Sequence, residues 1–156
     1  MFVSIRIIVY LQPKINGYDM TVNDKILSVI QAAINDEKKG ADLFAVDEKF
    51  AQFCKNELNL DISGYSHYIY SDDVRHLIKR HGQGSKDRNS ITNQDFLLIP
   101  IIQKEYDKIW VTKTKQGLYA ITYVKEIIDE YYYVEEIRTG KKKLALKELR
   151  KRKKKV

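Results

Sequence analysis

The sequence has few of the residues that break or cross-link a chain. It contains one cysteine, two prolines and seven glycines among 156 residues. The single Cys54 excludes an internal disulfide and a zinc site built from cysteines, and its apolar surroundings predict a buried structural thiol. So little proline and glycine argues against a disordered or loop-dominated chain. A hydrophobic content of 44% is enough for a globular core.

Long hydrophobic runs are also missing. The apolar runs that do occur are short, such as Ile7 to Leu11. They are far below the roughly 18–20 residues that cross a bilayer. The first residues lack the basic start and the small-residue cleavage site of a signal peptide. We therefore expect an intracellular, cytoplasmic protein with no membrane partner.

Several sequence signatures of enzymes are absent. We find no glycine-rich phosphate loop, no Gly-x-Ser-x-Gly elbow and no dinucleotide fingerprint. These absences argue against a kinase, an α/β-hydrolase and a dehydrogenase.

Positive charge is abundant but unevenly placed. The net charge is +7, and residues 141–156 contain ten basic residues and one acidic residue, which gives +9. Residues 1–140 therefore carry 7 − 9 = −2. Such a cationic end can bind nucleic acid by neutralising phosphates, although it can also serve as a solubilising terminus.

The first half predicts a strand and two helices. Residues 2–11 are rich in Val and Ile and predict a strand. Thr21 is a helix N-cap, after which Ile26, Leu27, Ile30, Ala33 and Ile34 form one apolar stripe. Lys38-Lys39-Gly40 predicts the helix end, with the glycine in a left-handed conformation. A second helix is predicted over about 47–58, and the loop 61–64 is a candidate boundary.

The second half has clearer signals. Residues 67–70 predict an extended segment, and Ser71 or Asp72 can cap a helix that ends at His81-Gly82. A polar loop follows over 83–90, and Thr92 caps a short helix. An antiparallel meander is then predicted from strands at 108–112, 118–128 and 131–139. Residues 143–147 fit either a fourth strand or a helix.

These elements predict an α+β fold, with an N-terminal strand and helices followed by helices packed on a four-stranded antiparallel sheet. The predicted organisation is a module of unknown role over 1–64, a domain over 65–150 and a basic tail over 151–156.

Two features of the second half can carry chemistry. On a helix, His76 lies one turn from Lys79 and Arg80, and His81 follows at the end. Such a group can transfer protons near neutral pH and stabilise phosphate charge, but it also fits a solvated basic helix whose His side chains complement the helix dipole. His76 and His81 are five residues apart, an awkward spacing for a metal site, so we expect no metal.

The second feature is a run of tyrosines in the predicted sheet. Alternation places Tyr131 and Tyr133 on one face and Tyr132 on the other. One face must pack on the helices, and the other can stack bases, although tyrosines are also ordinary strand residues.

The second half resembles a known family. The residues that carry the resemblance run from Asp73 to Gly82, from Ile91 to Pro100, from Tyr123 to Lys125, from Tyr133 to Lys141 and from Leu144 to Lys147. They are similar to the phage nuclease domains grouped with the barnase, EndoU, colicin-D and RelE-like ribonucleases. The family fold has helices followed by a four-stranded antiparallel sheet, and the resemblance covers about residues 65–150.

The resemblance implies a metal-independent endoribonuclease without a cofactor, a phage effector or toxin acting on RNA in a bacterial cell. A ribose 2′-hydroxyl would attack its own phosphate, with His81 or His76 as acid or base and Lys79 or Arg80 binding the phosphate. Further catalytic candidates are Lys125 and Thr139. Residues expected to bind nucleic acid are Arg75, Lys86, Arg88, Arg138, Lys141, Lys142, Lys143, Lys147 and Arg150.

One departure from the family pattern keeps alternatives open. Family members often have Thr or Ser shortly after the final Leu-x-Leu-Lys, where this chain has Glu148-Leu149-Arg150. Loss of a catalytic hydroxyl would favour weak activity or a non-catalytic nucleic-acid-binding protein, whereas Glu148 could also act as a base. A third hypothesis is a protein that blocks a host factor through residues 1–64. RNA, with transfer RNA as one candidate, and an immunity or host protein are the expected partners.

Overall fold

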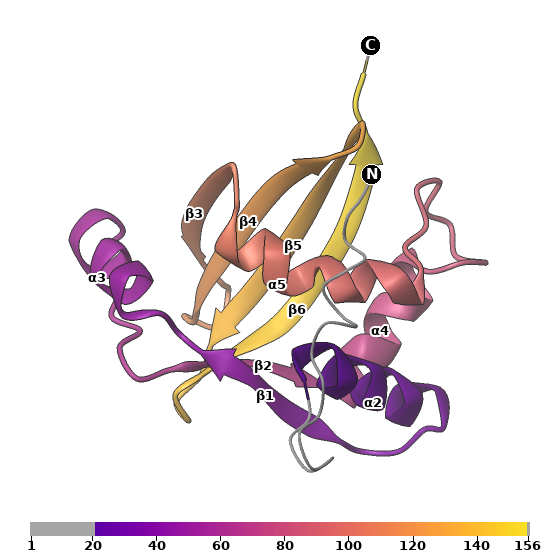
Figure 1. The fold of residues 1–156 in the computed structure, drawn as a ribbon, viewed down its shortest axis with the longest axis horizontal. Helices are drawn as coiled ribbons and strands as arrows, with labels where there is room; N and C mark the ends of the chain where they lie inside the picture. The colour runs from indigo at the N-terminus through magenta and orange to yellow at the C-terminus, as the bar shows by residue number, and fades with distance from the viewer. Residues whose placement is uncertain (1–20, 156) are drawn as a thin grey trace.

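A computed structural model describes residues 21–155, so the strand expected over 2–11 lies outside the described residues. The described residues form an α+β fold around one mixed six-stranded sheet (Figure 1). The strand order is β1-β2-β6-β5-β4-β3, in which β2 and β6 are parallel and the other neighbours are antiparallel. The predicted fold class is confirmed, but the sheet has six strands and not four.

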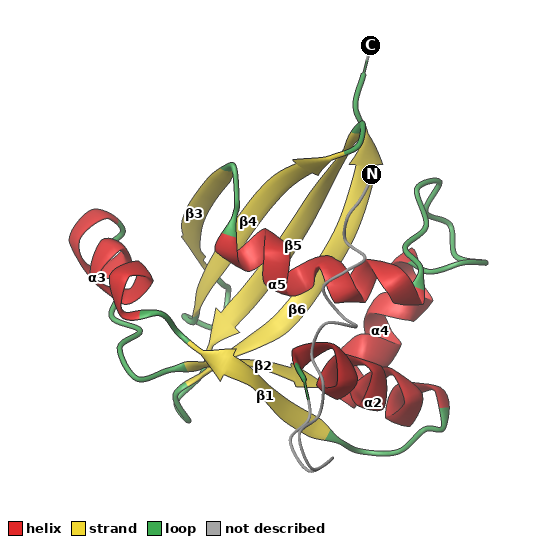
Figure 2. Cartoon of the chain, viewed as in Figure 1, coloured by secondary structure: helices red, strands yellow, loops and turns green. Residues whose placement is uncertain are grey.

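In chain order the elements are α2 (Val22–Ile34), β1 (Gly40–Ala45), α3 (Glu48–Glu57), β2 (Ser66–Tyr70), α4 (Ser71–His81), η1 (Asn93–Leu98), α5 (Ile99–Lys104), β3 (Lys108–Lys113), β4 (Tyr119–Ile127), β5 (Glu130–Arg138) and β6 (Lys143–Lys153). The longest connection is the loop over residues 82–92, between α4 and the short helix η1, and this loop projects away from the sheet (Figure 2). Within residues 21–155, no helix is long and apolar enough to cross a membrane.

Helix α2 starts as predicted but buries a different stripe. Thr21 forms a capping box with Asp24, because each side chain hydrogen-bonds the other residue's backbone N–H. Ile26 and Ile30 are buried, yet Leu27 and Ile34 are 47% and 58% exposed. The predicted burial of Leu27 and Ile34 was therefore wrong. The buried side of the helix also carries Val29, Ala32 and Ala33, and α2 packs against α4 and β1.

Strand β1 was not predicted. The helix ends at Ile34, the left-handed residue is Asp36 with a φ of 59°, and Gly40 begins β1 and does not stop the helix. A Cβ on Gly40 would collide with the side chain of Tyr68 on the paired strand β2, so the glycine serves a close approach between strands. Strands β1 and β2 extend the sheet beyond the expected four.

The cationic end is a strand for most of its length. Strand β6 runs through Lys153, which decides the open choice at 143–147 and leaves little of the expected tail at 151–156. Lys151 pairs with Tyr132 of β5 in register, and its ammonium lies 3.0 Å from Asp95 and 3.9 Å from Glu130. These contacts hold the end of the chain against the fold.

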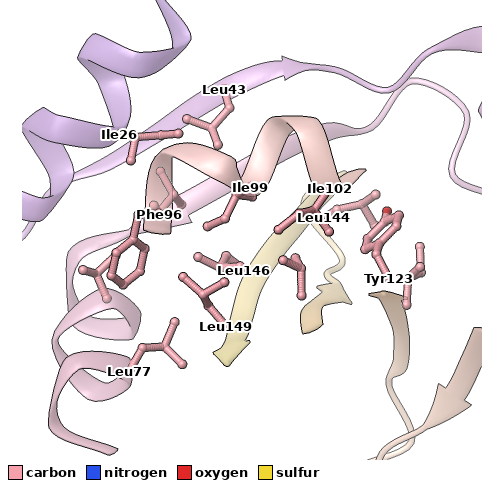
Figure 3. Packing of buried hydrophobic residues seen from close by; sticks show 14 of the residues in the cluster. Ile26, Leu43, Leu77, Phe96, Ile99, Ile102, Tyr123, Leu144, Leu146 and Leu149 are labelled. Carbon is pink, nitrogen blue, oxygen red and sulfur yellow. The ribbon is translucent and has the colours of Figure 1, made fainter. Parts of the chain in front are cut away.

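The core forms where η1 and α5 cross the sheet. Phe96, Ile99 and Ile102 pack toward Leu144, Leu146 and Leu149 of β6, and all six are at most 2% exposed (Figure 3). Each such side chain contributes about 1.5–3 kcal/mol by leaving water. Cys54 is fully buried as predicted, and burial raises the pKa of its thiol to about 11.

The two faces of the sheet differ. The Tyr132 hydroxyl donates to Asp95 of η1, so Tyr132 faces the helices, as one alternative of the alternation predicted. Tyr131 and Tyr133 therefore lie on the opposite face, together with the partners directly across from them on β6, Arg152 and Arg150.

Candidate active site on strands β5 and β6

The candidate site begins at His81, the last residue of α4. The helix stops at Gly82, where an added Cβ would lie 2.4 Å from the carbonyl oxygen of Ile78. The following loop folds back, so that Asp87 Oδ2 lies 2.8 Å from His81 Nδ1. Asp87 is itself held by the backbone N–H of Asn89 at 2.8 Å. The loop thus fixes the His81 ring from one side.

The other side of the ring faces β6. His81 Nε2 lies 3.0 Å from Glu148 Oε1, but the two atoms are not aligned as a hydrogen bond, and neither has another hydrogen-bond partner within residues 21–155. We treat the contact as electrostatic, since distance without direction makes a weak hydrogen bond. A carboxylate therefore lies at each ring nitrogen of His81, one hydrogen-bonded and one in electrostatic contact, and both favour positive charge on the ring.

A second carboxylate stands beside the first. Glu135 of β5 is directly opposite Glu148 of β6, which places their Cβ atoms about 5 Å apart on one face. Burial raises the pKa of Glu135, and the nearby charge of Glu148 raises it further. Asp87 differs: burial raises its pKa, but the hydrogen bonds from Asn89 and His81 outweigh burial and leave the pKa below its usual range.

Two guanidinium groups complete the site. Arg80 Nη2 lies 3.8 Å from Glu148 Oε1, and half of the Arg80 side chain is exposed. Arg150 follows Glu148 on the same face of β6 and lies over the Tyr133 ring, 4.0 Å from its centroid. Its Nη1 is buried without a hydrogen-bond partner in the described part of the chain.

Unpaired polar atoms concentrate in this site. Among residues 21–155, four buried side-chain nitrogen or oxygen atoms have no hydrogen-bond partner, and three of them belong to His81, Glu148 and Arg150. Buried polar atoms are nearly always paired in folded proteins, so a group of three requires an explanation. An anionic ligand with further hydrogen-bonding oxygens would satisfy the two donors.

The other predicted catalytic residues lie elsewhere. His76 and Lys79 are exposed on α4. Lys125 is directly opposite Tyr132, so it shares the helix-covered face, where its ammonium donates to the carbonyl oxygen of Glu105 at 2.8 Å. The Thr139 hydroxyl donates to the carbonyl oxygen of Lys143 and closes the β5–β6 connection.

Eight of the nine predicted nucleic-acid-binding residues lie away from this site, in two groups of four. Four are held by contacts within the fold: Arg75 by Asp72, Arg138 by Tyr65, Lys143 by Asp42 and Lys147 by Asp73. Four are exposed in connections: Lys86, Arg88, Lys141 and Lys142. Arg150 alone of the nine joins His81 and Arg80 at the site.

Sequence reasoning missed two members of the site. Glu135 lies in the segment that carries the resemblance, but a strand position alone does not show that a second carboxylate will face it. Asp87 lies in a polar loop and becomes relevant only because the loop folds back onto His81. Among residues 21–155, no group of three or more His, Cys, Asp or Glu is arranged to hold a metal ion.

Comparison with known proteins identifies the family. No curated protein and no solved structure matches the chain significantly. One family model does match, over residues 45–156, which is more than half of the chain and begins within β1. It is a family of nuclease domains, so nucleic acid is the class of substrate that membership implies. The chain belongs to the family described as phage-Barnase-EndoU-ColicinE5/D-RelE like nuclease3.

Proposed function

We propose that this protein is a metal-independent endoribonuclease whose reaction takes place beside His81, on the face of β5 and β6 that carries Glu135 and Glu148. The observation that carries the proposal is the group of His81, Glu148 and Arg150, each with a buried polar atom that lacks a hydrogen-bond partner within residues 21–155. The oxygens of a phosphodiester would accept from the two donors of this group, His81 Nε2 and Arg150 Nη1. Arginine binds phosphate oxygens well, so Arg80 and Arg150 are assigned to the phosphate.

The reaction requires an acid and a base on opposite sides of the phosphorus. The ribose 2′-oxygen forms a bond to phosphorus while the bond to the 5′-oxygen of the next nucleotide breaks. The 2′-hydroxyl proton passes to a base, and the leaving 5′-oxygen receives a proton from an acid. The products are a 2′,3′-cyclic phosphate and a free 5′-hydroxyl.

The spacing assigns these two roles. His81 is the acid, because its contacts suit the doubly protonated ring. Glu148 is already in contact with His81 and leaves no space for a phosphate between them. Glu135 is one strand further away, and its raised pKa brings it nearer to the value of an effective base at neutral pH. In this assignment Glu148 orients the His81 ring.

A substrate with one ribose tests this mechanism. We expect a DNA oligonucleotide with a single ribonucleotide to be cleaved in excess chelator, only on the 3′ side of the ribose, and to yield a cyclic phosphate. The same oligonucleotide with a 2′-O-methyl group should remain intact, because the nucleophile is blocked. Cleavage of the methylated strand, or cleavage that stops when chelator is added, would contradict the proposal.

Replacing Glu135 by glutamine should separate activity from stability. If Glu135 is the base, Glu135→Gln should lower the cleavage rate about 100-fold or more. The raised pKa means that ionised Glu135 destabilises the folded chain, and this penalty is present above the folded-state pKa and disappears below the ordinary value of 4.5. The variant should therefore have the higher urea midpoint at pH 7, with the difference narrowing as the pH falls toward 4.

Unfolding and cleavage measurements on the parent and on Glu135→Gln check this prediction. Urea unfolding at pH 7 and pH 4, beside cleavage assays, measures both effects. A variant that is less stable than the parent at pH 7, or as active as the parent, would remove Glu135 from the assigned role.

A second function, binding of nucleic acid without cleavage, also has structural support. Both ring nitrogens of His81 are in contact with carboxylates, an arrangement that also suits a site that binds phosphate without cleaving it. Salt-sensitive RNA binding by a protein that leaves every ribose-containing substrate intact would favour this second function.

A further inference from the structure

The fourth unpaired atom lies in a different part of the molecule, near Glu136 of β5. This carboxylate is fully buried and faces the helices. It accepts three hydrogen bonds, each of 2.8 Å, from the Tyr123 hydroxyl, the Gln103 side-chain amide and His67 Nδ1. The three donors satisfy the buried charge.

This arrangement fixes the Gln103 side chain in one orientation. A carboxylate only accepts hydrogen bonds, so the NH₂ group of Gln103 must point to Glu136 and its carbonyl oxygen must point away. That oxygen, Oε1, is buried and has no partner within residues 21–155, and the residue as a whole is only 5% exposed. Gln103 therefore presents a fixed acceptor that needs an N–H or O–H donor.

A cleft of about 1100 Å³ lies beside Gln103. The cleft lies between α3, the end of β1 and the end of α5, and Gln103 and His67 both line it. Since His67 Nδ1 is bound to Glu136, Nε2 is the ring nitrogen that remains for a ligand. The cleft thus has two polar groups of fixed orientation at one wall.

Aromatic and cationic side chains form the rest of the cleft. Phe44, Phe50, Phe53 and Tyr106 line it, and Phe53 is 36% exposed although it is apolar. The ammonium of Lys104 lies 4.6 Å from the centroid of the Phe44 ring. Aromatic faces beside a cation are the combination that binds unpaired bases of a nucleic acid and their phosphates.

We propose that this cleft binds an unpaired nucleobase with an exocyclic amino group, stacked on the aromatic side chains, with that amino group donating to Gln103 Oε1. Lys104 interacts with the phosphate of the same nucleotide. Cytosine and adenine have such an amino group, whereas uracil and hypoxanthine have a carbonyl oxygen at that position. A carbonyl facing Oε1 would leave two acceptors opposed, which gives the site its specificity.

The cleft lies on the helix-covered face, whereas Glu135 and Glu148 lie on the opposite face of the sheet, where Glu148 contacts His81. The proposal therefore goes beyond the proposed ribonuclease activity and does not require cleavage. Binding of a base in the cleft would select or orient a single strand at a distance from the reacting phosphate.

Titration of the full chain with mononucleotides tests the proposal. NMR shifts of the full chain are followed with CMP and UMP, and with AMP and IMP. We expect CMP and AMP to bind at least about tenfold more tightly than UMP and IMP, because an opposed acceptor pair loses a hydrogen bond. A 2′-O-methyl cytidine pentamer distinguishes the source of the base: tighter binding than CMP indicates a strand, and equal binding a free nucleotide.

Two variants locate the binding. Phe53→Ser should weaken CMP binding at least about tenfold, whereas Leu118→Ser, which also removes an exposed apolar side chain but lies before β4, should not change it. Gln103→Met should abolish the preference for CMP over UMP. If Gln103→Met does not fold, Phe53→Ser still decides the location of the site.

The contrary results are distinct from a failure of the nuclease proposal. Equal binding of CMP and UMP, CMP binding unchanged in Phe53→Ser, or no binding of any mononucleotide at millimolar concentration would overturn the cleft assignment. Each of these results can be obtained whether or not the protein cleaves RNA, since no step of the titration depends on His81.

Discussion

Replacing His81 by alanine is expected to reduce RNA cleavage about 100-fold to 10,000-fold, the range by which proton transfer from a positioned side chain accelerates a reaction. His81 is held between Asp87 and Glu148, at 2.8 Å and 3.0 Å, and is the proposed donor to the leaving oxygen. The measurement is the single-turnover rate on the oligonucleotide with one ribose. Added imidazole should restore part of the rate of His81→Ala, because it can occupy the space of the missing ring.

His76→Ala is the matched variant for this experiment. His76 lies on the same helix, but its side chain is exposed and belongs to a different turn. It should keep nearly the full rate, although the resemblance alone made it as good a candidate as His81. Equal losses in the two variants, or full activity in His81→Ala, would show that the reaction does not depend on the His81 site.

Replacing Glu136 by alanine is expected to lower the free energy of unfolding by about 3–5 kcal/mol, the usual effect of removing one partner from a buried charged network. Tyr123, Gln103 and His67 would each lose the acceptor that they share. Urea unfolding at pH 7 measures the change. The same variant should also abolish any preference among nucleotides in the cleft, because Gln103 would no longer be held in one orientation.

Glu126→Ala is the control for the loss of a glutamate from the same sheet. Glu126 pairs with Lys154 at 2.9 Å, and both side chains are exposed at the surface, by 39% and 47%. Such surface pairs contribute about 0–1 kcal/mol, so the control should remain close to the parent. A loss below about 1 kcal/mol in Glu136→Ala would mean that the network does not hold a buried charge.

The positive charge at the end of the chain is partly neutralised within the fold. Lys143, Lys147, Lys151 and Lys154 each form an ion pair with an acidic residue elsewhere in the fold. The end therefore contributes less free positive charge than the count of +9 implied. Among the other basic residues of this end, Arg150 faces the candidate site, because strand alternation places it beside Glu148.

The sequence by itself determined the α+β class and most elements of the second half, and it named His81 as a candidate catalytic residue. These features depend on local signals: the capping pattern at Thr92, the helix end at Gly82 and the alternation of Tyr131 to Tyr133 are each read from neighbouring residues. Such signals act over a few positions and are visible without a partner.

Only the tertiary structure decided what surrounds His81 and what lies in the cleft. Asp87 contacts His81 through a returning loop, Glu148 contacts it from β6, and the register of β5 with β6 places Glu135 opposite Glu148. Strand β1 and the Glu136 network likewise depend on pairing between segments far apart in the sequence. A register shift of one residue would turn a strand side chain such as Glu135, Glu136 or Glu148 to the other face of the sheet. Local sequence does not fix that register.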